Sequence, residues 1–168
     1  MIRRFAFAAA TLSILGVAAC ATTPAGPVGP APARFVAEDF AWSARGGQAS
    51  IQGRVAYRAD GRAFSCIASV GLTPDTPYTR ARFQTLYGST ERAAVPVAVV
   101  RARDIPDPNA DYRAFVRSEP CSGNAFSFTG LPDGGWFVIV PVRAEGGEPI
   151  VLMQRVQTRG GRIASLTL

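Results

Sequence analysis

The side chains that could carry catalysis in this chain are few in kind. All 18 basic residues are arginines, and the 168 residues include no lysine and no histidine. Without histidine there is no Ser–His or Cys–His nucleophile, no imidazole base and no histidine-ligated zinc. Without lysine there is no Schiff base and no Walker-type phosphate site. We therefore expect a non-enzymatic protein that uses no cofactor.

The first of three cysteines follows an apolar N-terminal run. Two arginines precede 15 uncharged residues, 5–19, whose last three, Val-Ala-Ala, lead directly into Cys20. A basic start, a short apolar run and small residues at its end are typical of a secretory signal. The run is shorter than the ~20 apolar residues of a membrane span. The pattern predicts export, and one alternative is an ordinary signal peptide whose cut site happens to lie near a cysteine.

The sequence Val-Ala-Ala-Cys at 17–20 also resembles the lipobox of bacterial lipoproteins. The resemblance implies that residues 1–19 are the signal peptide and that Cys20 carries a lipid, which makes the membrane a partner. Several acyl chains anchor stably, because each buried methylene contributes ~0.8 kcal/mol. Ala21 stands where an aspartate commonly marks inner-membrane retention, which implies the periplasmic face of the outer membrane. Nucleic acid is not an expected partner of an exported protein, despite a formal charge of +6.

The other two cysteines are Cys66 and Cys121. An even remainder in an oxidising compartment predicts a disulfide between them. The alternative is a pair of buried free thiols that pack as small apolar groups. Neither is expected to be a catalytic nucleophile, since no histidine can activate it.

Oxygen ligands gather in one loop, at Asp104, Asp107, Asn109 and Asp111. Their spacing is similar to the start of a calcium loop, in which alternating oxygens wrap the ion. The pattern then fails, because Tyr112 stands where glycine is needed and Ser118 where a bidentate glutamate is needed. We expect a polar loop and no metal. A pair of acids suited to glycoside hydrolysis remains an alternative.

Aromatic and arginine side chains provide a possible surface for sugars. The aromatics are Trp42, Tyr57, Tyr78, Tyr87, Tyr112 and Trp136, and the arginines are Arg80, Arg82, Arg101, Arg103 and Arg113. Rings can stack on sugars, and guanidinium groups can bind anionic glycans. The competing interpretation is burial, because Trp136 lies within an apolar run and Tyr57 follows the buried face of its segment.

The elements that must position these groups are mostly strands. Residues 20–34 combine Cys20 with a Pro/Gly-rich linker, and one domain is expected over 35–168. Alternating apolar residues and Gly/Pro/Asp turns predict an all-β sandwich. Expected strands are 49–57, 65–72, 95–100, 125–129, 136–142, 149–156 and 162–168, and the only expected helix is 78–86.

Two segments resemble carboxypeptidase regulatory-like domains. The first is residues 51–55 with the Asp60-Gly61-Arg62 turn, and the second is the block 126–138, which contains Leu-Pro-Asp-Gly-Gly at 131–135. The resemblance implies a prealbumin-like (transthyretin-like) Greek-key β-sandwich of about seven strands, with an insertion in 73–123. In the second turn we expect Gly134 or Gly135 to supply a positive φ.

Together these features predict a cell-envelope lipoprotein whose domain is a non-enzymatic structural or protein-interaction module. Envelope proteins or envelope glycans are its expected partners. The alternative is a carbohydrate-binding module, and the third interpretation is a hydrolase that uses a carboxylate pair.

Overall fold

The computed structural model describes residues 33–104 and 111–168. The predicted signal peptide, Cys20 and nearly all of the linker lie outside the described residues, as do Asp107 and Asn109 of the acidic loop. None of the helices in the described part is long and apolar enough to cross a membrane.

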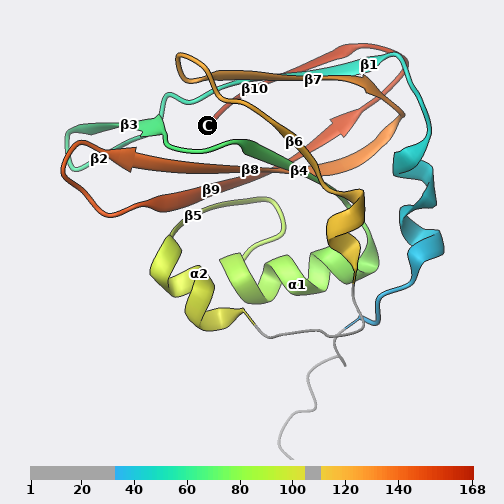
Figure 1. Ribbon diagram of the computed structural model, residues 1–168, viewed down its shortest axis with the longest axis horizontal. Helices are drawn as coiled ribbons and strands as arrows, with labels where there is room; N and C mark the ends of the chain where they lie inside the picture. Colours follow the sequence, from blue (N-terminus) through green and yellow to red (C-terminus); the bar gives the residue numbers. More distant parts are fainter. Residues whose placement is uncertain (1–32, 105–110) are drawn as a thin grey trace, which may run out of the picture. The chain divides into compact units, whose positions relative to one another are not determined.

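Two sheets face one another, and helices cover the far side of the larger sheet (Figure 1). The smaller sheet has the order β10-β1-β7, with β1 parallel to β10 and antiparallel to β7. Its strands are β1 (Ala49–Arg54), β7 (Ala125–Leu131) and β10 (Ile163–Thr167). The larger sheet holds β2 (Arg58–Ala59), β3 (Arg62–Cys66), β4 (Val70–Pro74), β5 (Arg92–Pro96), β6 (Arg117–Glu119), β8 (Gly134–Ala144) and β9 (Ile150–Thr158).

Strand β8 is the centre of the larger sheet and is apolar on both faces. It pairs with β9 along most of its length and with β3 and β4 on its other side. Trp136, Val138 and Val140 point into the core between the sheets, whereas Phe137 and Ile139 point to the helical side. Because successive side chains alternate between faces, one strand supplies two hydrophobic layers.

The helical side is built on α1 (Pro77–Tyr87) and α2 (Val97–Arg103). A capping box of Thr76 and Thr79 starts α1, and Gly88, in the left-handed conformation, ends it. Phe83 packs against Phe137, with ring centroids 4.8 Å apart. Two short 3-10 helices, η1 (Ala37–Ala44) and η2 (Tyr112–Phe115), meet the start of α1 in an aromatic cluster of Phe35, Phe40, Tyr78, Tyr112 and Phe115.

The predicted β-sandwich is confirmed, with ten strands in the described residues where about seven were expected. The single strand predicted over 65–72 is wrong, since the chain forms β3 and β4 with a break between them. Opposite the break, Pro141 accepts a hydrogen bond from the Ile67 N–H but has no N–H to return. A proline therefore interrupts the ladder on that side of β8.

The strand predicted over 95–100 is also wrong, and so is the expectation of a single helix. Pairing between β5 and β9 ends at Pro96 and Ile150, where β9 begins. The chain leaves the sheet there and turns into α2, and Val100 packs on the helical side of the larger sheet. Residues 97–100 are mostly β-branched, but they form part of a helix because β9 does not extend far enough to pair with them.

The tight turn before β8 contains a third difference. Neither Gly134 nor Gly135 has a positive φ; that conformation belongs to Gly130, just upstream. Glycine is required at 134 and 135 for space. A Cβ on Gly134 would lie 2.2 Å from the Trp42 ring, and one on Gly135 would lie 2.6 Å from the Asp75 carboxylate. The expected turn at Asp60 and Gly61 is present between β2 and β3, with positive φ at both residues.

Candidate functional site

The predicted cysteine pair is joined. Cys66, at the end of β3, and Cys121, in the connection from β6 to β7, form a disulfide with their Cα atoms 6.1 Å apart. Both residues are half-buried and pack against the core between the sheets. The bond ties the larger sheet to the segment that crosses to the smaller one, so its role is structural.

The six aromatics do not form a platform. Trp136 is fully buried and Tyr78 is 5% exposed. The remaining four are half-buried, and each packs on another ring: Trp42 on Trp136, Tyr57 on Phe64, Tyr87 on Phe83 and Tyr112 on Tyr78. No aromatic side chain in the described residues is fully exposed on a face. Stacking of a sugar on several coplanar rings is therefore not available in this part of the chain.

The five arginines lie on the helical side, and four of them have internal contacts. Arg80 and Arg82 form ion pairs with Asp75 and Asp104. Arg113 lies over the Tyr112 ring, 5.8 Å from its centroid. Arg103 donates to the Leu86 carbonyl at 3.3 Å, and Arg101 is exposed on α2. These arginines stabilise the helical layer more than they present a shared anion site.

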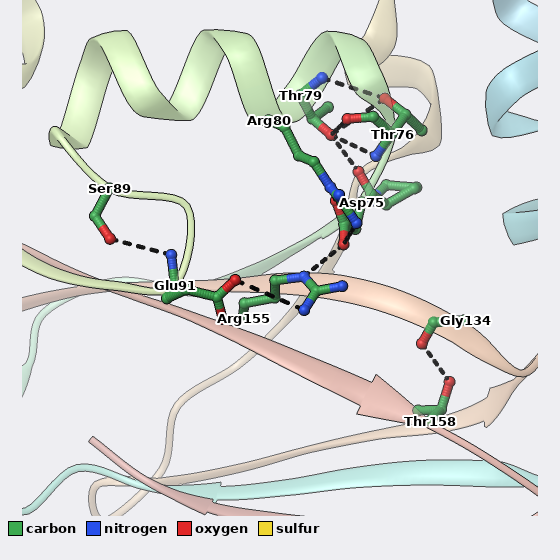
Figure 2. Close-up of polar contacts among 10 residues, drawn as sticks. Asp75, Thr76, Thr79, Arg80, Ser89, Glu91, Gly134, Arg155 and Thr158 are labelled. Carbon is green, nitrogen blue, oxygen red and sulfur yellow. Dashed lines mark hydrogen bonds and ion pairs between the residues drawn. The ribbon is translucent and has the colours of Figure 1, made fainter.

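The sequence analysis did not single out Asp75, whose carboxylate is buried. Figure 2 shows it between Arg80 of α1 and Arg155 of β9. The Asp75 side chain is 1% exposed and accepts from Arg155 Nε at 2.6 Å, while its backbone N–H donates to the Gly135 carbonyl at 2.9 Å. Glu91 pairs with the far side of Arg155 at 3.7 Å. No local sequence pattern predicts that Asp75 pairs with Arg155, which lies 80 residues further along the chain.

Burial by itself would raise the pKa of Asp75, but hydrogen bonds from Arg80 and Arg155 outweigh it and hold the pKa below its ordinary value of 3.8. The carboxylate is thus ionised at neutral pH and engaged by two guanidinium groups. A general acid needs a raised pKa, so this group is suited to holding α1 on the sheet and not to proton transfer.

The acidic loop is only partly described. Asp104 is paired with Arg82, and Asp111 is exposed at the start of η2. Within 33–104 and 111–168, no three acidic or cysteine side chains converge as a metal site requires.

The surface that could receive a ligand is the solvent face of the smaller sheet. Gln52 and Arg54 of β1 alternate with the buried Ile51, Gly53 and Val55, so they point away from the core. Gln52 lies between Ser127 and Ser165 in register, and Arg54 lies between Ala125 and Thr167. These residues, with Glu119 and Pro120 at the end of β6, line an open hollow of about 640 Å³, which we call the outer-face hollow.

The outer-face hollow provides hydrogen-bonding groups on a rigid support. Its exposed side chains carry hydroxyl, amide, guanidinium and carboxylate groups, and backbone pairing fixes the three strands beneath them. Such a surface can bind several hydroxyl or amide groups of a partner at once. Sequence analysis assigned these strands correctly but had no signal that singled out their solvent face.

Comparisons with known proteins support the fold. No family model and no curated protein matches this chain. Among solved structures, it is similar to a candidate carbohydrate binding protein from Pseudomonas aeruginosa, with 19% sequence identity and a TM-score of 0.53. The match covers 80% of this chain and 97% of the other.

Proposed function

We propose that this protein is a cell-envelope lipoprotein, held by a lipid on Cys20, whose β-sandwich is a non-catalytic binding module. The N-terminal pattern at 1–20 supports the anchor, and the residues of the Pro/Gly-rich linker give the domain reach from the membrane. The motifs at 51–62 and 126–138 support membership of the carboxypeptidase regulatory-like, prealbumin-like domains. Under this proposal the protein lies on the periplasmic face of the outer membrane.

The outer-face hollow carries the proposal. It places exposed polar side chains from three paired strands on one surface, while the core lies behind them. Its only carboxylate is Glu119, and hydrolysis by a carboxylate pair needs two. The surface is therefore better suited to binding than to the hydrolase alternative, and an envelope protein with a polar face is the partner we propose first.

A second candidate is binding of an envelope glycan. The specific observation in its favour is the likeness to a solved structure described as a candidate carbohydrate binding protein. The hydroxyl, amide and guanidinium groups of the hollow suit a saccharide, whose hydroxyls both donate and accept hydrogen bonds. The absence of an exposed aromatic platform in the described residues favours recognition by hydrogen bonds over stacking.

A capture experiment tests the proposal and separates its two forms. Detergent-solubilised full-length protein is used to capture partners from solubilised envelopes, before and after enzymatic removal of protein or of glycan. Arg54→Ala, which removes a guanidinium from the hollow, should reduce capture about tenfold, since one hydrogen bond to a charged group has that effect. Arg143→Ala, which removes an exposed arginine from β8, is the matched control. Equal capture by both variants contradicts the assignment of the hollow.

A further inference from the structure

A second, smaller hollow lies where the larger sheet extends beyond the smaller one. Strand β5 is the edge of the larger sheet and pairs only with β9, with Arg92 opposite Gln154 and Ala94 opposite Leu152. Directly paired residues share a face. Leu152 belongs to the core between the sheets, so Arg92 and Ala94 also face inward. Both are nevertheless exposed, which shows that the smaller sheet leaves the inner face of β5 uncovered.

The space left there is a pocket of about 320 Å³, which we call the edge pocket. Leu152, Leu168 and the Tyr57 ring give it apolar walls, and Arg92 and Gln154 give it polar groups. Phe64 holds the Tyr57 ring in place edge-on, with centroids 5.2 Å apart. Apolar walls with a few polar groups are the usual composition of small-molecule sites, and the volume lies at the lower end of their ~300–1,000 Å³ range.

The polar groups of the edge pocket lack partners within the described residues. Gln154 Oε1 is buried and receives no hydrogen bond. The guanidinium of Arg92 forms none of the ion pairs found in the described part of the chain, although its neighbour Glu91 does. A buried acceptor without a donor is unfavourable, so a rotation of the Gln154 amide that lets Oε1 accept from an O–H or N–H group in the edge pocket would be favourable. Arg92 offers a planar donor set that matches a carboxylate.

We propose that the edge pocket binds a hexuronic acid unit at the end of an acidic glycan. The carboxylate of the sugar pairs with Arg92, and a ring hydroxyl donates to Gln154 Oε1. The C–H face of the sugar ring lies against Tyr57, Leu152 and Leu168. The volume admits one such ring. This inference rests on the glycan form of the proposed function and assigns it a second contact point, separate from the outer-face hollow.

The carboxylate, a hydroxyl and the ring of the ligand each contact a different part of the edge pocket. A neutral hexose satisfies Gln154 but leaves the Arg92 guanidinium without a counter-charge. A simple carboxylate such as acetate pairs with Arg92 but brings no hydroxyl to Gln154 and no ring to the apolar walls. The uronic acid combines all three, and this combination sets the order of affinities that an experiment should find.

The test is calorimetric titration of the detergent-solubilised full-length protein with sodium glucuronate, glucose and acetate. Glucuronate should bind saturably and at least about tenfold more tightly than glucose or acetate, because it alone engages every group. Arg92→Gln should reduce glucuronate binding about tenfold, and Gln154→Leu should also weaken it. Arg143→Gln removes an exposed charge elsewhere and should leave binding unchanged. Unfolding temperatures confirm that each variant is folded.

Equal affinity for glucuronate, glucose and acetate would overturn the inference, and so would binding that is unaffected by Arg92→Gln. Absence of glucuronate binding in the wild type overturns it as well. Capture of an envelope glycan through Arg54 in the preceding experiment is a separate readout. If that capture persists while glucuronate fails to bind, the edge-pocket assignment is wrong and the proposed function stands.

Discussion

Asp75 holds a buried negative charge between arginines from two different elements. Arg80 reaches it from the first turns of α1, and Arg155 reaches it from β9, across the sheet that the helix covers. Removing one member of a buried ion pair leaves the other charge uncompensated, and the cost is commonly ~3–5 kcal/mol. Here the cost should be lower, because Arg80 is 53% exposed and water screens its contribution.

We predict that Asp75→Asn lowers the free energy of unfolding by about 2–3 kcal/mol at neutral pH. Glu148→Gln, which removes an exposed carboxylate, is the control and should change it by less than about 0.5 kcal/mol. The pKa of Asp75 is lowered on folding, so its stabilisation is complete above the unfolded value near 3.8 and is lost as pH falls through the folded value. In urea unfolding, the difference between wild type and variant should therefore shrink below about pH 4. A difference that stays constant down to pH 2 would contradict this account.

Gly134 illustrates a glycine retained for space. Its Cβ position is filled by the Trp42 ring, which also packs edge-on against Trp136 at 4.9 Å. We predict that Gly134→Ala destabilises the fold by about 1–3 kcal/mol, as overpacking of a rigid site does. Gly46→Ala is the matched control, because nothing lies within 4 Å of its Cβ position and its φ is not positive. Thermal unfolding measures the stability of both variants. Equal unfolding temperatures would show that the Trp42 ring can move aside without destabilising the fold.

At the scale of single residues, the disulfide could be predicted from the sequence, whereas the ion pair between Asp75 and Arg155 could not. Cysteine chemistry has a single solution once two thiols remain, so Cys66 and Cys121 could be paired without structural knowledge. Any of the 18 arginines in this chain is a possible ion-pair partner for a given aspartate. The choice of Arg155 by Asp75 depends on the pairing of β4, β8 and β9, which residue types alone do not define.

Among the elements, the disulfide connects parts that the hydrogen-bond ladders leave apart. It joins the end of β3 to the connection between β6 and β7, across a sequence separation of 55 residues. A loop of that length, when closed, stabilises by about 4 kcal/mol in the chain-entropy model. The backbone N–H of Cys66 also donates to Asn124 Oδ1 at 3.0 Å, which holds the same two segments together.

We predict that the Cys66→Ser, Cys121→Ser double variant unfolds about 10 °C or more below the wild type. Peptide mapping of native protein without reductant should recover the two peptides as a linked pair. Free thiols that are alkylated at both positions in freshly prepared protein would contradict the bond and weaken the argument for an oxidising compartment.

Strands could be predicted where apolar and polar residues alternate in step with burial. They could not be predicted where the presence of a paired neighbouring strand determines whether the segment extends. The alternation in β1 and β7 follows from their residues, since one face lies on the core and the other in solvent. The run at 97–100 has strong β propensity and still forms a helix, because β9 begins only at Ile150 and Pro149 before it accepts from the Val97 N–H but has no N–H to continue a ladder. The break between β3 and β4 depends in the same way on Pro141 in a strand that lies far along the chain.

For the molecule as a whole, the proposal joins an anchored N-terminus to a binding domain. We predict that Cys20→Ser abolishes acyl labelling and shifts the protein from the membrane to the soluble periplasmic fraction. The expected reason is loss of the acyl chains, which are the membrane attachment that the proposal assigns to Cys20. Wild-type protein is the positive control for labelling. If the wild type takes no acyl label while the variant still fractionates with membranes, the anchor is not a lipid on Cys20.

The sandwich class could be predicted because strands and turns recur through the whole domain. The helical layer on one side of the sandwich was predicted only in part, because α1 was expected over 78–86 whereas the β-branched residues of α2 indicated a strand. The candidate site was missed for a related reason. Exposed Gln, Arg, Ser and Thr side chains are ordinary on the solvent face of a sheet, and only the register brings Gln52, Ser127 and Ser165 into one row.

The central claim is that the domain binds an envelope partner through the outer-face hollow, and crosslinking in living cells tests it most directly. A photo-activated amino acid at Gln52 should give a discrete adduct with an envelope protein or glycan, and Arg54→Ala should reduce its yield about tenfold. The same amino acid at Arg143, on the other sheet, should give no such adduct. An absence of adducts from Gln52, or the same adducts from both positions, would contradict the account.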